Sequence, residues 1–187
     1  RSVVRCRRAG HNTDVTGIVQ AVADVGVSSV DDGFVLGGGA TACSAVAALG
    51  RLGASRVRVV VRSPERAADV LATGKRLGVT VELLTWGDAA AAGSASGLVV
   101  STVPASAAEQ AVDVLERLPH PAVLLDVVYD PWPTPVAQAW ERRGGTSVGG
   151  FAMLLHQAVE QVRLMTGRTP DIDAMRQAGL STLASRR

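Results

Sequence analysis

The sequence predicts an α/β fold in which helices cover both faces of a doubly wound parallel sheet. The first observation is a set of short valine-rich runs whose apolar residues are nearly continuous rather than alternating, which is typical of strands buried on both faces. The second is that longer amphipathic segments rich in alanine and leucine separate these runs. Such alternation indicates repeated strand–helix–strand units, whose ligands bind at the carboxyl ends of the strands.

Five runs in the middle of the chain are predicted strands, and helices are predicted between most of them. The strands are expected at Phe34–Leu36, Val57–Val61, Val79–Leu84, Leu98–Val100 and Val123–Val128. The helices are expected at Ala40–Leu52, Glu65–Leu77, Ala107–Arg117 and Pro135–Arg142. The low-complexity stretch Ala89–Gly97 is expected to form a weak helix or a loop.

The beginning of the chain departs from this alternation. Arg1–Arg8 is a short strand-like piece with four arginines, which we interpret as a solvated edge. A helix is expected from Asp14 to about Val25. Because the first residue is arginine and no signal-type apolar segment follows it, we expect the chain to start partway through a longer protein.

The end of the chain is predicted to contain one more strand and two helices. The strand is expected near Thr146–Val148, and the helix after it from Gly149 to Thr166. Pro170 and Asp171 are expected to open a final amphipathic helix that runs to about Leu183. Proline suits the first helical position because its missing N–H would have no partner there.

The composition excludes several classes of protein. At 187 residues the chain is one ordinary domain, or a domain with a fragment of another. Its 47% hydrophobic and 19% charged residues exclude intrinsic disorder. A net charge of only +2 predicts no nucleic-acid partner, and no apolar run approaches the roughly 18 residues of a membrane span.

The cysteines and histidines predict neither a disulfide scaffold nor a metal site. Cys6 and Cys43 are far apart, which fits the reducing cytoplasm. His11, His120 and His156 are scattered, so they form no cluster with metal-ligand spacing.

A glycine-rich turn follows the first predicted strand and opens a helix. Gly37, Gly39 and Ala42 fill the G-x-G-x-x-G/A positions of a dinucleotide-binding fingerprint and predict a Rossmann-like sheet. Residues without side chains let the backbone approach a pyrophosphate, which then faces the unpaired N–H groups of the helix. The alternative is a tight turn with no ligand. The residues expected to hold the pyrophosphate are Gly37, Gly38, Gly39, Ala40 and Thr41.

Two arginines near the end of the next strand favour NADP over NAD. NAD-binding versions of this fold usually place an acidic residue there, for the ribose 2′-hydroxyl. Arg62 and Ser63 occupy that position, with Arg66 one turn further on. Guanidinium groups grip a phosphate through bidentate bonds, so these residues predict a 2′-phosphate site. The alternative is a solvated helix start.

Five motifs occur in an order that resembles the shikimate dehydrogenase family over essentially the whole chain. They are Asn12-Thr13-Asp14, the Gly37–Ala42 turn, Arg62-Ser63-x-x-Arg66, Asp126-x-x-Tyr129-x-Pro131-x-x-Thr134-Pro135 and Gly150-x-x-Met153-Leu154-x-x-Gln157-Ala158. The resemblance implies that residues 1–13 are the edge and hinge of a substrate domain. Residues 14–187 would be an NADP-binding Rossmann-like domain with C-terminal helices.

The resemblance also implies three substrate-binding residues. Asp14 would be catalytic, hydrogen-bonding a substrate hydroxyl and pairing with a lysine upstream of Arg1. Tyr129 would line the shikimate pocket, and Gln157 would bond a shikimate hydroxyl. The alternatives are that Asp14 or Thr13 caps the following helix, that Tyr129 is a buried aromatic, and that Gln157 is a surface residue.

Three further residues are implied at the nicotinamide end of the cofactor. The backbone carbonyls of Val127 and Gly150 would approach the nicotinamide, and Met153 would pack on its ring. Taken singly, Met153 is better explained as core filler.

The implied function is NADP-dependent interconversion of 3-dehydroshikimate and shikimate by hydride transfer, in the cytoplasm and without a metal. The enzyme is a possible homodimer. Because the lysine that acts as general acid is expected upstream of Arg1, the 187-residue chain alone is expected to be largely inactive. Two alternatives stay open: an NAD-using quinate/shikimate dehydrogenase, and a non-catalytic nucleotide-binding module that has lost its substrate domain.

Overall fold

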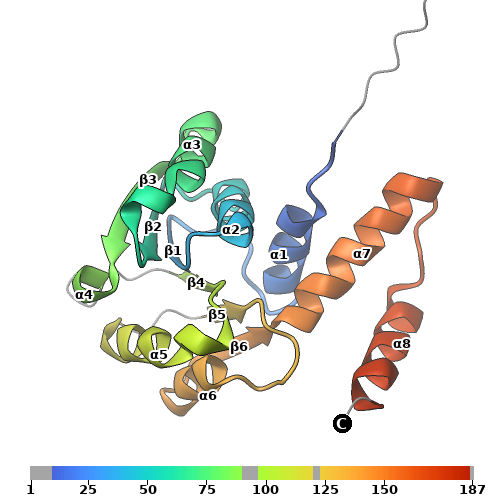
Figure 1. The fold of residues 1–187 in the computed structure, drawn as a ribbon. Helices are drawn as coiled ribbons and strands as arrows, with labels where there is room; N and C mark the ends of the chain where they lie inside the picture. Colours follow the sequence, from blue (N-terminus) through green and yellow to red (C-terminus); the bar gives the residue numbers. More distant parts are fainter. Residues whose placement is uncertain (1–9, 90–96, 120–122, 186–187) are drawn as a thin grey trace, which may run out of the picture.

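A six-stranded parallel sheet forms the centre of the molecule (Figure 1). The computed structural model describes residues 10–89, 97–119 and 123–185. The strand order is β3-β2-β1-β4-β5-β6, and every pairing is parallel. The order therefore reverses between β1 and β4, where a doubly wound sheet opens its crevice. The strands are β1 Asp32–Leu36, β2 Arg56–Val61, β3 Thr80–Thr85, β4 Leu98–Ser101, β5 Val123–Asp126 and β6 Thr146–Gly149.

Helices cover both faces of the sheet, as the sequence predicts. Those on one face are α1 Thr13–Ala23, α2 Ala40–Arg51, α3 Ala68–Leu77 and α7 Gly150–Thr166. Those on the other are α4 Trp86–Ala89, α5 Ala108–Arg117 and α6 Pro135–Arg142. Figure 1 shows α8, Ile172–Ala184, beside α7 and away from the sheet. Two short 3-10 turns, η1 Pro64–Arg66 and η2 Ala105–Ala107, precede α3 and α5.

Strands β1, β2, β4 and β5 each contribute to two hydrophobic cores, one on each face of the sheet. In β1, Val35 joins the core under α1, α2, α3 and α7, whereas Phe34 and Leu36 join the core under α5 and α6. In β4, Val100 and Val99 divide in the same way. Burial on both faces is why these strands read as continuous apolar runs, and the predicted strand type is confirmed.

Two predicted helix starts are wrong. The helix expected from Glu65 begins only at Ala68, because the chain first makes the 3-10 turn η1 with N–H groups bonding three residues back. This turn buries Ala67. Pro170 is not the first residue of the last helix: Asp171 is its N-cap, and the Asp171 side chain accepts from the N–H groups of Asp173 and Ala174.

The fifth strand is two residues shorter than predicted. Its ladder with β6 ends at Asp126, opposite Gly149. The Asp126 side chain then accepts from the Val128 N–H, and the Val128 carbonyl accepts from the Gly150 N–H. The backbone of residues 127 and 128 therefore turns toward the start of α7 instead of continuing the strand.

Several predicted features lie outside the described residues. They are the strand-like piece at 1–8 with its four arginines and Cys6, most of the stretch 89–97, and His120. Among the helices that are described, none is long and apolar enough to cross a membrane.

Candidate cofactor and substrate site

The glycine turn closes against the end of strand β4. Gly37 has a φ of +108°, a conformation that favours glycine. A Cβ on Gly37 would overlap the Thr102 hydroxyl, so a side chain is excluded there. The Thr102 N–H and hydroxyl both donate to the Leu36 carbonyl at 2.8 Å, which joins the ends of β1 and β4.

The other side of the turn is open, which is what a close-lying ligand requires. A Cβ on Gly39 would meet nothing within 4 Å. Gly39 is also the N-cap of α2, and no side chain caps this helix. The first N–H groups of α2 therefore lack intrahelical acceptors and lie beside open space, as in an anion-binding helix end. These residues fit a dinucleotide pyrophosphate.

Two adjoining hollows run along the carboxyl ends of the strands from this turn; together we call them the nucleotide groove. One has a volume of about 570 Å³ and the other about 350 Å³, and both are lined by Gly38, Gly39, Val61 and Arg62. The first also has Ser63, Arg66 and Ala67 in its lining. The lining of the second includes Gly37, Trp86, Thr102, Val103, Ser106 and Gln110.

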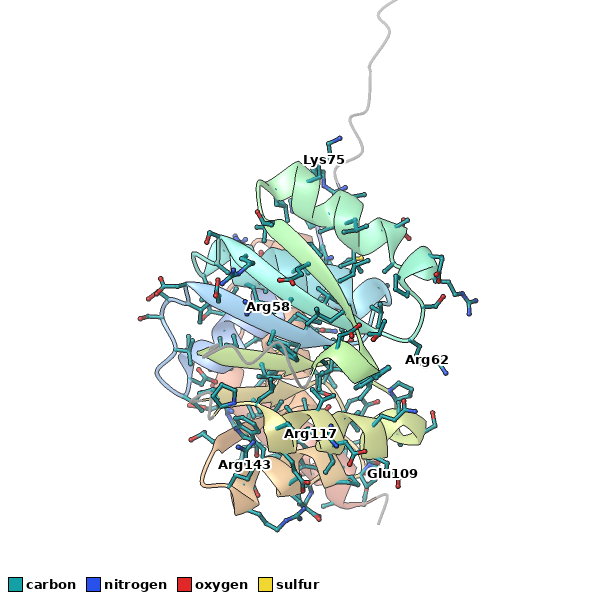
Figure 2. The ribbon with its side chains drawn as sticks, turned by 90° about the vertical axis from the view of Figure 1, so that its left-hand side faces the viewer. Arg58, Arg62, Lys75, Glu109, Arg117 and Arg143 are labelled. Atoms are coloured by element: carbon teal, nitrogen blue, oxygen red, sulfur yellow. The ribbon has the colours of Figure 1, made fainter. Side chains whose placement is uncertain are left out.

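Arg62 and Arg66 face the groove with exposed guanidinium groups. Figure 2 shows Arg62 where β2 ends, in contrast to Arg58 over the middle of the sheet. Within the described ranges neither Arg62 nor Arg66 has a carboxylate partner. Two unpaired cations beside a hollow suit a phosphate.

The Ser63 side chain is hydrogen-bonded to Glu65 of the same loop. Its hydroxyl donates to Glu65 at 2.5 Å, and this bond lowers the pKa of the Glu65 carboxyl below its ordinary value. Glu65 is exposed and adjoins the lining of the groove. A phosphate bound here would therefore compete with Glu65 for the Ser63 hydroxyl.

The helix that carries Asp14 is capped by its neighbour Asn12. The Asn12 side chain accepts from the Asp14 N–H at 3.0 Å and donates to Ser44 of α2, also at 3.0 Å. Neither Thr13 nor Asp14 is the cap, so that alternative is wrong. No side chain in the described part of the protein bonds the half-buried Asp14 carboxylate.

Helices α1 and α7 bring Asp14 and Gln157 close together. Gly17 of α1 lies against the Met153 carbonyl and Gln157 Cβ of α7. Asp14 precedes Gly17 by one turn on a similar face of α1. The Gln161 side chain donates to the Thr13 hydroxyl at 3.1 Å.

His156 lies on a different face of α7 from its neighbour Gln157. Its Nε2 is 2.8 Å from the Asp24 carboxylate at the end of α1.

A buried carboxyl, Asp126, ends strand β5. It accepts from the Thr134 hydroxyl at 2.6 Å and from the Val128 N–H at 3.3 Å. Burial in an apolar hollow raises the pKa of Asp126, while the Thr134 hydroxyl, the Val128 N–H and the nearby Ser101 hydroxyl partly lower it. The Ser101 hydroxyl is close enough to act on that charge but does not reach hydrogen-bonding geometry.

Gly150 and Met153 have clear structural roles. A Cβ on Gly150 would overlap the Val127 carbonyl, so the start of α7 lies directly on the segment that follows β5. Met153 is only 6% exposed and belongs to the core between α1, α7 and the sheet. The expected contacts of Val127, Gly150 and Met153 with a nicotinamide stay predictions.

Tyr129 is exposed rather than buried, so the buried-aromatic alternative is wrong. It lines a pocket of about 400 Å³ between the loop after β5, the start of α7 and the end of α8. Trp132, Phe151, Leu180 and Leu183 line the same pocket.

Comparison with known proteins shows that this chain is similar to shikimate dehydrogenases. Residues 150–178 match the family model of the shikimate 5'-dehydrogenase C-terminal domain. A shikimate dehydrogenase (NADP(+)) of Rubrobacter xylanophilus is 39% identical over 173 residues, which are 90% of this chain and 61% of that protein. The resemblance to shikimate dehydrogenases is confirmed. The chain spans about three fifths of the length of the curated relatives it matches.

Solved structures of dehydrogenases are also similar to this chain. Shikimate dehydrogenase of Mycobacterium tuberculosis matches with a TM-score of 0.78 and 39% identity, covering 89% of this chain and 61% of that one. A quinate dehydrogenase of Corynebacterium glutamicum in complex with NAD matches with a TM-score of 0.80 and 26% identity, covering 92% and 63%. The Rossmann-like doubly wound fold is therefore confirmed.

Sequence reasoning missed part of the nucleotide groove. Trp86, Thr102 and Gln110 come from three separate segments and meet only in the fold. The buried Trp86 Nε1 has no hydrogen-bond partner in the described residues. No pattern within any one segment signals this convergence.

Proposed function

We propose that this chain is the NADP-binding part of a shikimate dehydrogenase and takes part in the interconversion of 3-dehydroshikimate and shikimate. The observation that carries the proposal is the nucleotide groove. It combines an open glycine turn, a helix start without a side-chain cap, and two guanidinium groups that pair with no carboxylate among the described residues. The name of the Rubrobacter relative supports NADP as the cofactor.

The groove offers a separate seat for each negative group of NADP. The N–H groups at the start of α2 face the open side of Gly39, where the pyrophosphate would lie. Arg62 and Arg66 would bind the 2′-phosphate with charge-assisted hydrogen bonds. The rest of the dinucleotide would cross the crevice between β1 and β4 toward the end of β5.

The substrate would be held by residues on and beside helices α1 and α7. Asp14 and Gln157 lie on the packed pair α1 and α7, and Tyr129 lies beside the start of α7. Gln157 follows Gly150 by two helical turns of α7, so these two residues are roughly 10 Å apart along the helix axis. That span suits a small polyhydroxylated acid. The nicotinamide cofactor, when bound, supplies or accepts the hydride, and Asp14 orients the substrate hydroxyl.

The remaining expectations from the sequence belong to this proposal as well. They are the division into residues 1–13 and 14–187, a cytoplasmic location, a homodimer, and the lack of nucleic-acid and membrane partners. None enters the argument for the groove.

A second candidate is an NAD-using quinate/shikimate dehydrogenase. The structural likeness to the Corynebacterium quinate dehydrogenase, which was solved with NAD, favours it. Arg62 and Arg66 argue against it, because the ribose 2′-hydroxyl of NAD is normally met by an acid.

Titration calorimetry with NADP⁺ and NAD⁺ tests both candidates. We expect NADP⁺ to bind at least about tenfold more tightly, because two guanidiniums meet its extra phosphate. Arg62→Ala should remove most of that preference, whereas Lys75→Ala on the exposed face of α3 should keep it (Figure 2). Tighter binding of NAD⁺ would favour the second candidate, and no binding of either cofactor to the folded chain would refute both.

A further inference from the structure

Asp126 holds both ends of the loop that carries Tyr129. The loop runs from Val127 to Thr134, between β5 and α6. At its start, one carboxyl oxygen of Asp126 accepts from the Val128 N–H. At its end, the other oxygen accepts from the Thr134 hydroxyl. The loop therefore leaves the sheet after Asp126, and at its end Thr134 returns to form a hydrogen bond with the same residue.

Few other polar groups in the described part of the protein lie near the Asp126 carboxyl. Asp126 is 1% exposed and lies between Ser101 of β4 and Gly149 of β6. A small hollow of about 50 Å³ beside it is lined almost entirely by apolar residues and prolines. Burial of a carboxyl in such surroundings is unfavourable unless hydrogen bonds compensate. The two loop bonds are therefore the principal contacts that keep the carboxyl in place.

Thr134 links this carboxyl to helix α6. Its hydroxyl donates to Asp126 and accepts from the Ala137 N–H at 3.0 Å, as the N-cap of the helix. Both hydrogen-bonding roles of the hydroxyl are used. Loss of the hydroxyl would release the end of the loop as well as the first turn of α6.

The start of the loop supports the first residue of α7. The Val128 carbonyl accepts from the Gly150 N–H at 3.1 Å, and the Val127 carbonyl lies against Gly150 with no room for a side chain. A shift at Val127 and Val128 therefore shifts the beginning of α7. In the proposed function, the residues at the ends of β4 and β5 would hold the nicotinamide half of NADP, next to Val127 and Val128.

We infer that Asp126 is a positioning residue for the nicotinamide half of the cofactor. Through Val128 and Thr134 it sets the place of Tyr129, the Val127 carbonyl and the start of α7, without contacting the cofactor itself. The inference rests on the proposed function, but it concerns a residue to which the resemblance gave no role. It also predicts that the adenosine half, which is bound beside β2, does not depend on Asp126.

The test compares a whole cofactor with half of one. Adenosine 2′,5′-bisphosphate occupies only the Arg62 and Arg66 end of the groove, whereas NADP⁺ also extends over β5. Calorimetry would measure both ligands on the wild type, Asp126→Ala and Thr134→Val. We expect each variant to bind NADP⁺ about tenfold more weakly and the bisphosphate as the wild type does. Thr134→Ser keeps the hydroxyl and should restore NADP⁺ affinity.

Unchanged bisphosphate affinity also shows that a variant is folded, and Thr134→Val keeps the test decisive if Asp126→Ala does not fold. Wild-type NADP⁺ affinity in both folded variants would overturn the inference, as would an equal loss for both ligands or a failure of Thr134→Ser to restore binding. If the folded wild type bound neither ligand, the proposed function itself would fall, and the inference with it.

Discussion

Gly17 of α1 lies so close to Met153 of α7 that a Cβ on the glycine would stand 2.6 Å from the Met153 carbonyl oxygen. The two helices approach at this point because no side chain separates them. The same approach brings Gly17 against Cβ of Gln157, one turn from Asp14 on α1. A glycine inside a helix otherwise weakens it, so the close approach is its physical justification.

Gly17→Ala should therefore destabilise the protein although alanine is the better helix former. We expect a loss of about 1–3 kcal/mol in the free energy of unfolding, as for overpacking in a core. Urea unfolding followed by circular dichroism measures it. The matched control is Gly87→Ala in α4, where the added Cβ would be 3.8 Å from the nearest atom and should cost nothing. Equal effects of the two substitutions would contradict the packing argument.

Gly39→Ala should separate cofactor binding from stability. A Cβ on Gly39 has open space around it, and its φ of −87° suits alanine. We expect a loss of stability of roughly 1 kcal/mol or less, since alanine is a poorer N-cap than glycine. The same methyl group would occupy the pyrophosphate seat, so NADP⁺ affinity should fall at least about tenfold. Unchanged affinity in calorimetry would mean that the pyrophosphate lies elsewhere.

Glu65→Gln should tighten NADP⁺ binding. The Glu65 carboxylate repels a 2′-phosphate and holds the Ser63 hydroxyl, and the lowered pKa of Glu65 keeps it charged at neutral pH. We expect an increase in affinity of about threefold to tenfold that shrinks at high salt. NAD⁺ lacks the 2′-phosphate, so its affinity should stay the same. A parallel gain for both cofactors would assign the effect to something other than the phosphate.

The stability of the wild type relative to Asp126→Asn should fall as pH rises. The pKa of Asp126 in the folded protein is raised from its ordinary value of 3.8, so folding favours the protonated carboxyl. Its contribution to stability is complete below pH 3.8 and is lost as pH rises through the higher folded pKa. Urea unfolding of both proteins at several pH values from 4 to 7 measures this. A stability difference that grows with pH would show that hydrogen bonding outweighs desolvation.

The sheet was predictable because its inner strands are buried on both faces and therefore have a characteristic apolar sequence pattern. Val57–Val61 and Val123–Asp126 read as apolar runs whatever lies around them. The exact helix boundaries depend on individual side-chain hydrogen bonds, which the amino-acid composition does not indicate. Asn12 rather than Thr13 or Asp14 caps α1, because its side chain can also reach Ser44 of α2.

The candidate site was predictable only where its residues are contiguous. The glycine turn and the Arg62-Ser63-x-x-Arg66 motif each lie in one short segment. The residues within each motif are therefore close together whatever the fold is. The bond between Asp126 and Thr134 requires the chain to return to the sheet after a loop. The engagement of Ser63 by Glu65 was likewise unforeseen, since both residues also suit other partners.

The two bonds of the Asn12 side chain have a mechanical consequence. One amide group is tied both to the first turn of the helix bearing Asp14 and to the helix whose N-terminus opens the nucleotide groove. Any hinge motion that carried α1 away from α2 would have to break the contact with Ser44 first. The carboxylate that would be catalytic in the proposed reaction is in this way connected through one side chain to the helix that would bind the coenzyme pyrophosphate.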